Sequence, residues 1–255
     1  YTYSEAVEKM GYIQDFDKYT ICEAISSHFS LFSVAPIVFI NVLDPKSHKN
    51  TENTILTVVD GETVLEVDGV LVDTIVVKNE AGDVTYENTP GDIKYEVEFD
   101  NDGYVHIFTK VADKISVEFD RLDPTMVDSS DIIGGVGIDG KYTGLEVVNE
   151  VFPRFREVPG IIIAPKYSTD SAVAAVMKAK ASNINGLFQA LAFVDVDTER
   201  VTGYSDVTNH KNQNNLDDPN LVVCWPKVSL GGVQYHLSTQ LASLANQVDG
   251  NNEGY

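Results

Sequence analysis

The chain has 255 residues, with 18 Lys and Arg against 39 Asp and Glu, and its formal net charge is −21. An apolar fraction of 43% beside 22% charged residues is ordinary for a folded protein and argues against wholesale disorder. The acidity argues against capture of nucleic acid or anionic membrane, because both need clustered Lys and Arg, and no apolar stretch approaches the ~20 residues of a spanning helix.

The first 44 residues predict two helices followed by a strand. Ser4 suits the N-cap of a helix that ends at Gly11, and apolar positions at three- and four-residue steps predict a second helix over residues 17–32. Residues 37–42 then begin with four consecutive apolar residues. A run that is apolar on both faces is typical of a central strand covered by helices.

Residues 46–133 have a different composition and a different period. They hold 20 acids and 7 bases, a net charge of −13, whereas the remaining residues carry −8. Apolar and polar residues alternate around residues 93–99 and 115–119, and Asp-Gly pairs separate such runs, which predicts six to eight short antiparallel strands. We expect an inserted acidic all-β domain here, a small antiparallel barrel or sandwich.

Helices and strands alternate again from Gly134 onward. The sequence predicts a helix that ends before Pro153, a helix capped by Ser168 or Thr169, and a polar helix near residues 205–214. Strands are expected near residues 161–163, 191–196 and 221–225. A last helix begins near Ser238, and its predicted inner face comprises Leu241, Leu244, Ala245 and Val248.

The resulting fold class is α/β, with a mixed, mostly parallel sheet flanked by helices and an inserted β domain. Residues 1–45 plus 134–255 form the discontinuous α/β domain, and residues 46–133 form the insertion. The strand at residues 37–42 is expected to lie in one sheet with the three later strands.

Gly135, Gly137 and Gly140 match the G-x-G-x-x-G pattern that brings backbone N–H groups close to a pyrophosphate. That site needs a preceding buried strand, and here only two isoleucines precede the motif. The acid expected about 20 residues on falls at Glu157, in a Pro-flanked loop. A hinge returning from the inserted domain is therefore favoured over a nucleotide site.

Asp195, Asp197 and Glu199 follow a predicted strand, at the sheet edge where α/β proteins bind ligands. Carboxylates there could hold Mg²⁺ or act as acid and base. No cluster of basic residues accompanies them, which favours an ordinary turn.

The remaining motif candidates are also weak. Glu98, Asp100 and Asp102 have calcium-loop spacing, but Thr109 stands at the twelfth position, so a hairpin turn is favoured. None of the five histidines has a second ligand at metal spacing, and Cys22 and Cys224 read as two separate buried thiols. We therefore predict no catalytic, cofactor-binding or metal-binding residues, and no enzyme.

Three longer stretches resemble the contractile tail sheath proteins of bacteriophages and related phage-tail-like particles. They include APIVFINVLDP at residues 35–45, VPGIIIAP at 158–165 and NGLFQA at 185–190. The resemblance covers the first 45 and the last 115 residues, with the match carried by Tyr19–Pro45, Tyr142–Pro165 and Asn183–Thr198, and the β insertion carries no signature of its own.

The resemblance implies a structural subunit that polymerises around a tail tube and contracts to drive it through the host envelope. It implies six-membered rings stacked helically, arms that add strands to neighbouring subunits, and further contacts with tube and baseplate proteins. The expected location is the virion tail, after assembly in the bacterial cytoplasm, without direct contact with nucleic acid or membrane.

The resemblance also implies that the N-terminal arm and the C-terminal domain are missing, so that this fragment folds without polymerising. The alternative is an acidic α/β enzyme that binds a nucleotide or Mg²⁺ at Gly135–Gly140 or at Asp195 and Asp197.

Overall fold

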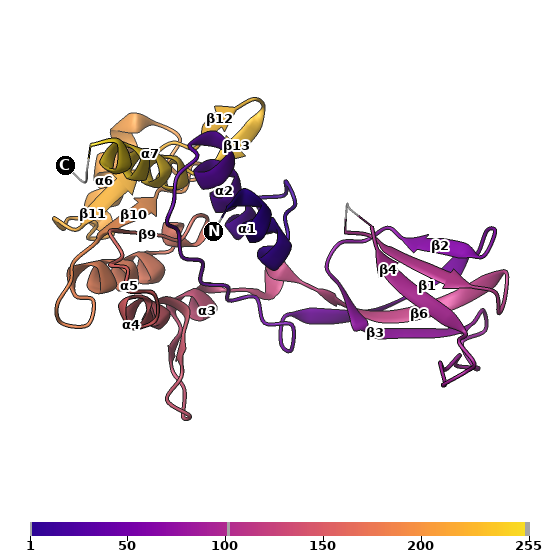
Figure 1. The fold of residues 1–255 in the computed structure, drawn as a ribbon. Coiled ribbons are helices and arrows are strands. Elements are labelled where there is room, and N and C mark those ends of the chain that lie inside the picture. The colour runs from indigo at the N-terminus through magenta and orange to yellow at the C-terminus, as the bar shows by residue number, and fades with distance from the viewer. Residues whose placement is uncertain (1, 101–102, 253–255) are drawn as a thin grey trace. The chain divides into compact units, whose positions relative to one another are not determined.

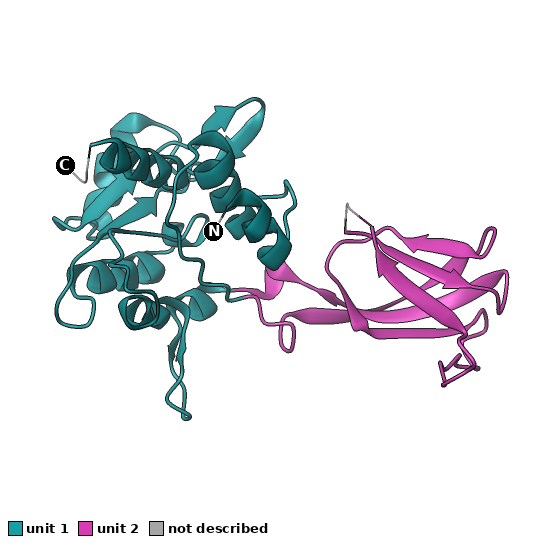
Figure 2. Ribbon diagram, viewed as in Figure 1, with its two compact units in different colours: residues 1–42, 128–255 teal, residues 43–127 magenta. Residues whose placement is uncertain are grey.

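The described chain begins with helices, strands follow, and helices and strands then alternate toward its C-terminal end (Figure 1). The structure is a computed structural model that describes residues 2–100 and 103–252. It divides into two compact units (Figure 2): unit 1 comprises residues 1–42 with 128–255, and unit 2 comprises residues 43–127. None of the described helices is long and apolar enough to cross a membrane.

Unit 1 contains seven α-helices, three short helical turns of other types and seven strands among its described residues. The α-helices are α1 (Tyr3–Met10), α2 (Thr20–Ile25), α3 (Ser129–Ile133), α4 (Val151–Phe155), α5 (Ser171–Ser182), α6 (Tyr204–Gln213) and α7 (Leu237–Asn251). The π-helical turn η1 (Ser26–Leu31) and the 3₁₀ turns η3 (Gly144–Glu150) and η4 (Tyr167–Thr169) belong to this unit, and the 3₁₀ turn η2 (Pro124–Met126) belongs to unit 2.

A three-stranded parallel sheet lies in unit 1. It has the order β11-β10-β9 and comprises β9 (Ile161–Ile163), β10 (Leu191–Asp195) and β11 (Leu221–Cys224). Helix α5 connects β9 to β10, and α6 connects β10 to β11, as parallel pairing requires. Two antiparallel hairpins complete the strands of unit 1: β7 (Gly135–Val136) with β8 (Tyr142–Thr143), and β12 (Val228–Leu230) with β13 (Val233–Tyr235).

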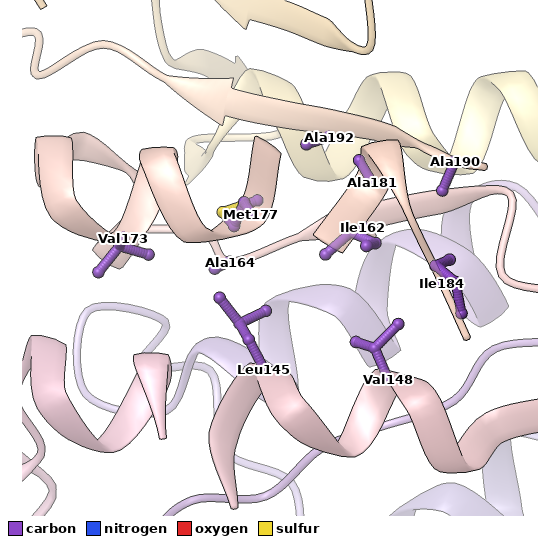
Figure 3. Close-up of a cluster of buried hydrophobic side chains, with 10 residues drawn as sticks. All are labelled: Leu145, Val148, Ile162, Ala164, Val173, Met177, Ala181, Ile184, Ala190 and Ala192. Atoms are coloured by element: carbon purple, nitrogen blue, oxygen red, sulfur yellow. The ribbon is translucent and has the colours of Figure 1, made fainter. Parts of the chain in front are cut away.

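The largest apolar cluster of unit 1 lies between α5, the parallel sheet and η3 (Figure 3). Val173 and Met177 of α5 are fully buried, and Leu145 and Val148 approach them from η3. The N-cap of α5 is Asp170, whose carboxylate accepts the Ala172 N–H at 2.7 Å. The predicted caps Ser168 and Thr169 were wrong, because both belong to the preceding turn η4.

Unit 2 consists of two three-stranded antiparallel sheets, with the orders β1-β6-β3 and β2-β5-β4. Their strands are β1 (Lys49–Thr57), β2 (Glu62–Leu65), β3 (Val70–Asn79), β4 (Tyr95–Phe99), β5 (Val105–Thr109) and β6 (Lys114–Leu122). Both sheets contribute to one apolar cluster, which includes Val77 and Val117 from the first and Val105 and Ile107 from the second. Alternate residues of β5 are buried, as the period of two predicts.

The mixed α/β class predicted from the sequence is confirmed. Parallel pairing is limited to β9, β10 and β11 among the described strands, so the strands of unit 1 are not mostly parallel. The described strands of unit 2 form two open sheets, with no closed barrel.

The predicted strand at residues 37–42 was wrong. These residues are extended but, within the described chain, they pair with no strand. Ile40 packs against the cluster beside α5, whereas the Val38 side chain is exposed. The sequence pattern failed because an apolar run does not by itself show whether a strand lies beside it.

Two helix boundaries also differ from the predictions. Thr2, and not Ser4, caps α1, because its hydroxyl accepts the Glu5 N–H while the Glu5 carboxylate accepts the Thr2 N–H. Helix α4 runs through Pro153 and does not end before it. Pro153 is the third residue of α4, in the first turn, where a backbone N–H has no partner within the helix.

Candidate functional site

Buried polar side chains gather in unit 1 where α7 packs against η1 and the end of β10. Burial without hydrogen bonds would cost each of these groups free energy, so their partners decide what the cluster does. We call this cluster the α7 network, and its members are Glu23, Ser27, His28, Ser168, Asp195, His236, Ser238, Gln240 and Ser243.

Asp195, the last residue of β10, stands at the start of α7. Its carboxylate accepts the Ser238 N–H at 3.0 Å, the Ser238 hydroxyl at 2.5 Å and the Ser168 hydroxyl at 3.3 Å. Its own N–H donates to the Ser168 oxygen at 3.0 Å. Burial raises the pKa of Asp195 above its ordinary value, although the bonds from Ser238 and the nearby His236 act in the opposite direction.

Glu23 and His236 form a second buried contact, between α2 and the residue that precedes α7. One carboxylate oxygen of Glu23 accepts the His236 N–H at 2.7 Å, and the other lies 2.7 Å from the His236 Nδ1. Both side chains are almost wholly buried, which makes each the required partner of the other.

A chain of hydrogen bonds continues from there along the packed faces of η1 and α7. The Ser27 hydroxyl lies 2.7 Å from that of Ser243 and accepts the Gln240 side-chain amide at 3.0 Å. Ser243 Oγ lies 2.9 Å from the His28 Nδ1, and burial lowers the pKa of His28. The α7 network thus joins α2 and η1 to α7, segments more than 200 residues apart in the sequence.

The geometry of the α7 network fits packing and does not fit catalysis. Its hydroxyls and carboxylates are bound to one another and are buried, so a substrate has no access to them. Cys224 lies beside Asp195, and burial together with that carboxyl raises the pKa of the thiol to about 12, which keeps it protonated and unreactive near neutral pH. Among the described residues, no group of three or more His, Cys, Asp or Glu side chains could hold a metal ion.

The glycine motif at Gly135–Gly140 forms the exposed hairpin β7–β8. The Gly137 N–H donates to the Lys141 carbonyl at 2.8 Å, and the Gly140 N–H donates to the Gly137 carbonyl at 2.9 Å. The next helical element, η3, begins only at Gly144. Backbone N–H groups that the phosphate-binding turn would offer are therefore used inside the hairpin, and the nucleotide alternative has no support in this geometry.

Asp195 and Asp197 have separate surroundings. Asp195 is buried in the α7 network, whereas the Asp197 carboxylate accepts the Glu199 N–H at 2.9 Å and lies 3.3 Å from the Arg200 Nε in a partly exposed turn. The turn interpretation of Asp197 agrees with these contacts. The two carboxylates do not share a site for Mg²⁺.

The other candidates are equally explained by local contacts. Asp100 accepts the Tyr104 N–H at 2.8 Å and lies 3.2 Å from the His106 Nε2, while Asp102 lies outside the described residues. Cys22 and Cys224 are free and buried, as expected. A surface hollow of about 310 Å³ beside α5 is lined largely by amides and small side chains and includes Lys178, which lies 4.0 Å from Asp218.

Sequence reasoning missed most of the α7 network and was wrong for part of the predicted inner face of α7, although Leu241 of that face packs against the core. Ser238, Thr239 and Ser243 are fully buried, whereas Leu244 and Val248 of the predicted inner face are exposed. The sequence held one signal: α7 has a single charged residue, Asp249, although the chain is strongly acidic. A helix with so few charges has no obvious solvent face.

These observations describe a protein in which buried polar residues hold distant segments of the chain together. No protein-family profile matches the chain. The tail sheath protein of Burkholderia phage BcepMu is 29% identical over 183 residues, which are 69% of this chain and 36% of that relative. This similarity confirms the resemblance to the bacteriophage tail sheath proteins, and the chain spans about a third of the length of the curated relative it matches.

Proposed function

We propose that this chain is part of a structural subunit of a contractile phage tail sheath, or of a related phage-tail-like particle. The observation that carries the proposal is the similarity to a phage tail sheath protein over 183 residues. In this proposal the subunits form six-membered rings that stack helically around a tail tube and adjoin baseplate components. They assemble in the bacterial cytoplasm and act in the virion tail, where contraction drives the tube through the host envelope.

We propose further that residues 46–133 are a domain inserted into a discontinuous domain of residues 1–45 plus 134–255. The two open sheets of unit 2 and their shared apolar cluster support a small antiparallel sandwich for the insertion. Its residues hold −13 of the net charge of −21. Such a lobe keeps crowded subunits soluble by mutual repulsion and need not bind a ligand.

The α7 network supports movement of unit 1 as a rigid body during contraction. Glu23, Asp195 and His236 tie the first helices, the sheet and the last helix through buried hydrogen bonds. Such bonds are costly to break singly, since each loss leaves a buried polar group without a partner. A packed core of this kind has few intermediate arrangements. We therefore expect contraction to change the contacts between subunits and to leave the interior of unit 1 unchanged.

The parallel sheet supports strand addition by arms of neighbouring subunits. In the described chain β9 and β11 stand at its two edges. The edge of a sheet is a template for another strand. The half-buried apolar side chains of β9 and β11 would be covered by the added strand.

The protein composition of purified phage tails tests the proposal. Tails purified after induction or infection of the source bacterium should contain peptides from this chain in amounts comparable with those of the tube protein. Antibodies against the acidic insertion, residues 46–133, should label the tail along its length in electron micrographs. Intact contractile tails without these peptides would contradict the proposal, and baseplate-only labelling would reassign the chain to another tail component.

A further inference from the structure

The hairpin β7–β8 carries an apolar tip that the chain itself does not use. Ile138, at its turn, is fully exposed, and Val136 is 62% exposed. Figure 1 shows the hairpin extending away from the rest of unit 1, between α3 and η3. Turn tips usually carry Gly, Asn, Asp or Pro, and a fully exposed isoleucine contributes nothing to the folding of its own chain.

The base of the hairpin is fixed in place. A Cβ on Gly134 would lie 1.9 Å from the Thr143 carbonyl oxygen, and one on Gly144 would lie 2.5 Å from the carbonyl oxygens of Asp131 and Ile132. Both glycines have positive φ, and the two backbone segments at the base of the hairpin lie in close contact there. The flanking elements α3 and η3 contribute Ile132 and Leu145 to the main core. The hairpin therefore begins and ends in well-packed segments.

A second exposed apolar surface, which we call the α7 stripe, lies on α7. Leu244 and Val248, one helical turn apart, are 42% and 46% exposed, and Leu241 beside them packs against the core. Ser238, Gln240 and Ser243 of the same helix belong to the α7 network. Leu31, at the end of η1, is also exposed, and the adjoining Phe32 carbonyl accepts the Gln247 side-chain amide at 2.8 Å, which places η1 beside this stripe.

Both surfaces are nearly uncharged on an acidic chain. Residues 135–143 contain one acid, Asp139, and one base, Lys141, which lie 2.9 Å apart, and α7 contains only Asp249. Two copies that each carry −21 repel one another over most of their surface. Contact between copies is therefore least unfavourable where the acids are absent.

We propose that the β7–β8 tip of one copy docks on the α7 stripe of a second copy, with Ile138 against Leu244 and Val248. The identity of the partner rests on the proposed function, because a sheath needs contacts between unlike surfaces that can repeat. A pairing of α7 with α7 would close a dimer and end growth, whereas a tip-to-stripe contact leaves one tip and one stripe free. The contact is small, so by itself it gives a transient encounter and no stable dimer.

Disulfide trapping tests this contact on the chain as it stands. Ile138→Cys and Val248→Cys variants, distinguished by a mass tag, are mixed under mild oxidation, since a disulfide forms only where Cα atoms come within about 7 Å. The mixture should form the mixed dimer about tenfold faster than a mixture of Ile138→Cys with Tyr204→Cys, whose tyrosine is 83% exposed on α6. Wild-type chain gives the background, because Cys22 and Cys224 are buried.

A second substitution controls for chance proximity. Adding Leu244→Asp to the Val248→Cys chain should slow mixed-dimer formation about tenfold, which corresponds to about 1.4 kcal/mol. Leu244 is exposed, so the variant should keep wild-type Trp225 fluorescence. Equal rates for the Val248 and Tyr204 partners, faster homodimers of either variant alone, or no effect of Leu244→Asp would each overturn the proposal.

The result is independent of the test of the proposed function. If purified tails contain the chain but the mixed dimer does not form, the docking contact fails and the sheath role stands. If the mixed dimer forms but tails lack the chain, the contact stands and the sheath role fails.

Discussion

Replacing Asp195 with Ala should destabilise unit 1 strongly. The substitution leaves the Ser238 N–H and the Ser238 hydroxyl, both fully buried, without the acceptor that they share. Each buried donor left without a partner costs about 1–3 kcal/mol, so the free energy of unfolding should fall by about 2–6 kcal/mol. The Ser168 hydroxyl keeps its bond from the Asp195 N–H, because that donor belongs to the backbone.

Asp195→Asn separates hydrogen bonding from charge. Its amide oxygen can still accept the Ser238 N–H, and its NH₂ can donate to a serine oxygen, so the expected loss is only about 1 kcal/mol. This agrees with the raised pKa of Asp195, which means that the buried site favours a neutral side chain. Asp197→Ala, in the partly exposed turn, is the matched control and should cost less than about 1 kcal/mol.

Urea unfolding followed by tryptophan fluorescence measures these losses. Trp225 is the single tryptophan, it lies in unit 1, and its indole N–H donates to the Val201 carbonyl at 2.8 Å, so its signal reports this unit. An Asp195→Ala chain within about 1 kcal/mol of wild type, or an Asp195→Asn chain as unstable as Asp195→Ala, would refute the role given to these hydrogen bonds.

The raised pKa of Asp195 predicts that the stability difference between wild type and Asp195→Asn depends on pH. Because folding raises the pKa of Asp195, the folded state holds this proton more tightly than the unfolded state. The contribution to stability is therefore complete below the ordinary pKa of 3.8 and is lost as pH rises through the raised value. The deficit of Asp195→Asn relative to wild type should shrink with rising pH across that window, and a deficit that grows would contradict the burial argument.

Two further predictions concern other parts of the chain. Gly144→Ala should lower the free energy of unfolding by more than about 3 kcal/mol, because its Cβ would lie 2.5 Å from backbone oxygens. Gly140→Ala, at positive φ in open space, should lower it by about 1 kcal/mol in the same urea assay. Equal losses for the two variants would contradict the close backbone contact at Gly144. NMR titration should place the pKa of His106 above 6.5, because its ring bonds to Glu62 and Asp100, and that of His28 below 6.5, because it is buried. Glu62→Gln should lower the pKa of His106 and leave that of His28 unchanged, and a shift of both would point to a change of the whole fold.

Local patterns in the sequence were sufficient for elements whose neighbours lie close in the chain. The period of two identified the strands of unit 2, since a half-buried strand shows its two faces in its own residues. The polar helix α6 (Tyr204–Gln213) and the strands β9, β10 and β11 were also predicted near their observed positions. Turn chemistry favoured ordinary turns at Asp197 and Asp100, and both carboxylates accept backbone N–H groups there.

The prediction failed where the partner of a residue lies far away in the sequence. Residues 37–42 read as a central strand, but an apolar run does not reveal whether a strand pairs with it. Leu244 and Val248 read as part of the inner face of α7, because hydrophobic spacing normally marks the core. The buried side of α7 includes polar residues instead, since Asp195 and Ser27 supply partners that satisfy their buried groups.

By itself the sequence determined the mixed α/β class, the acidic β segment and the likeness to phage tail sheath proteins, because composition, period and extended similarity are properties of the chain read in order. Only the tertiary structure decided that Glu23 meets His236 and that Asp195 meets Ser238. The physical reason is that burial of a polar group is acceptable only beside a matching partner, and that partner is chosen by the folding of distant segments against one another.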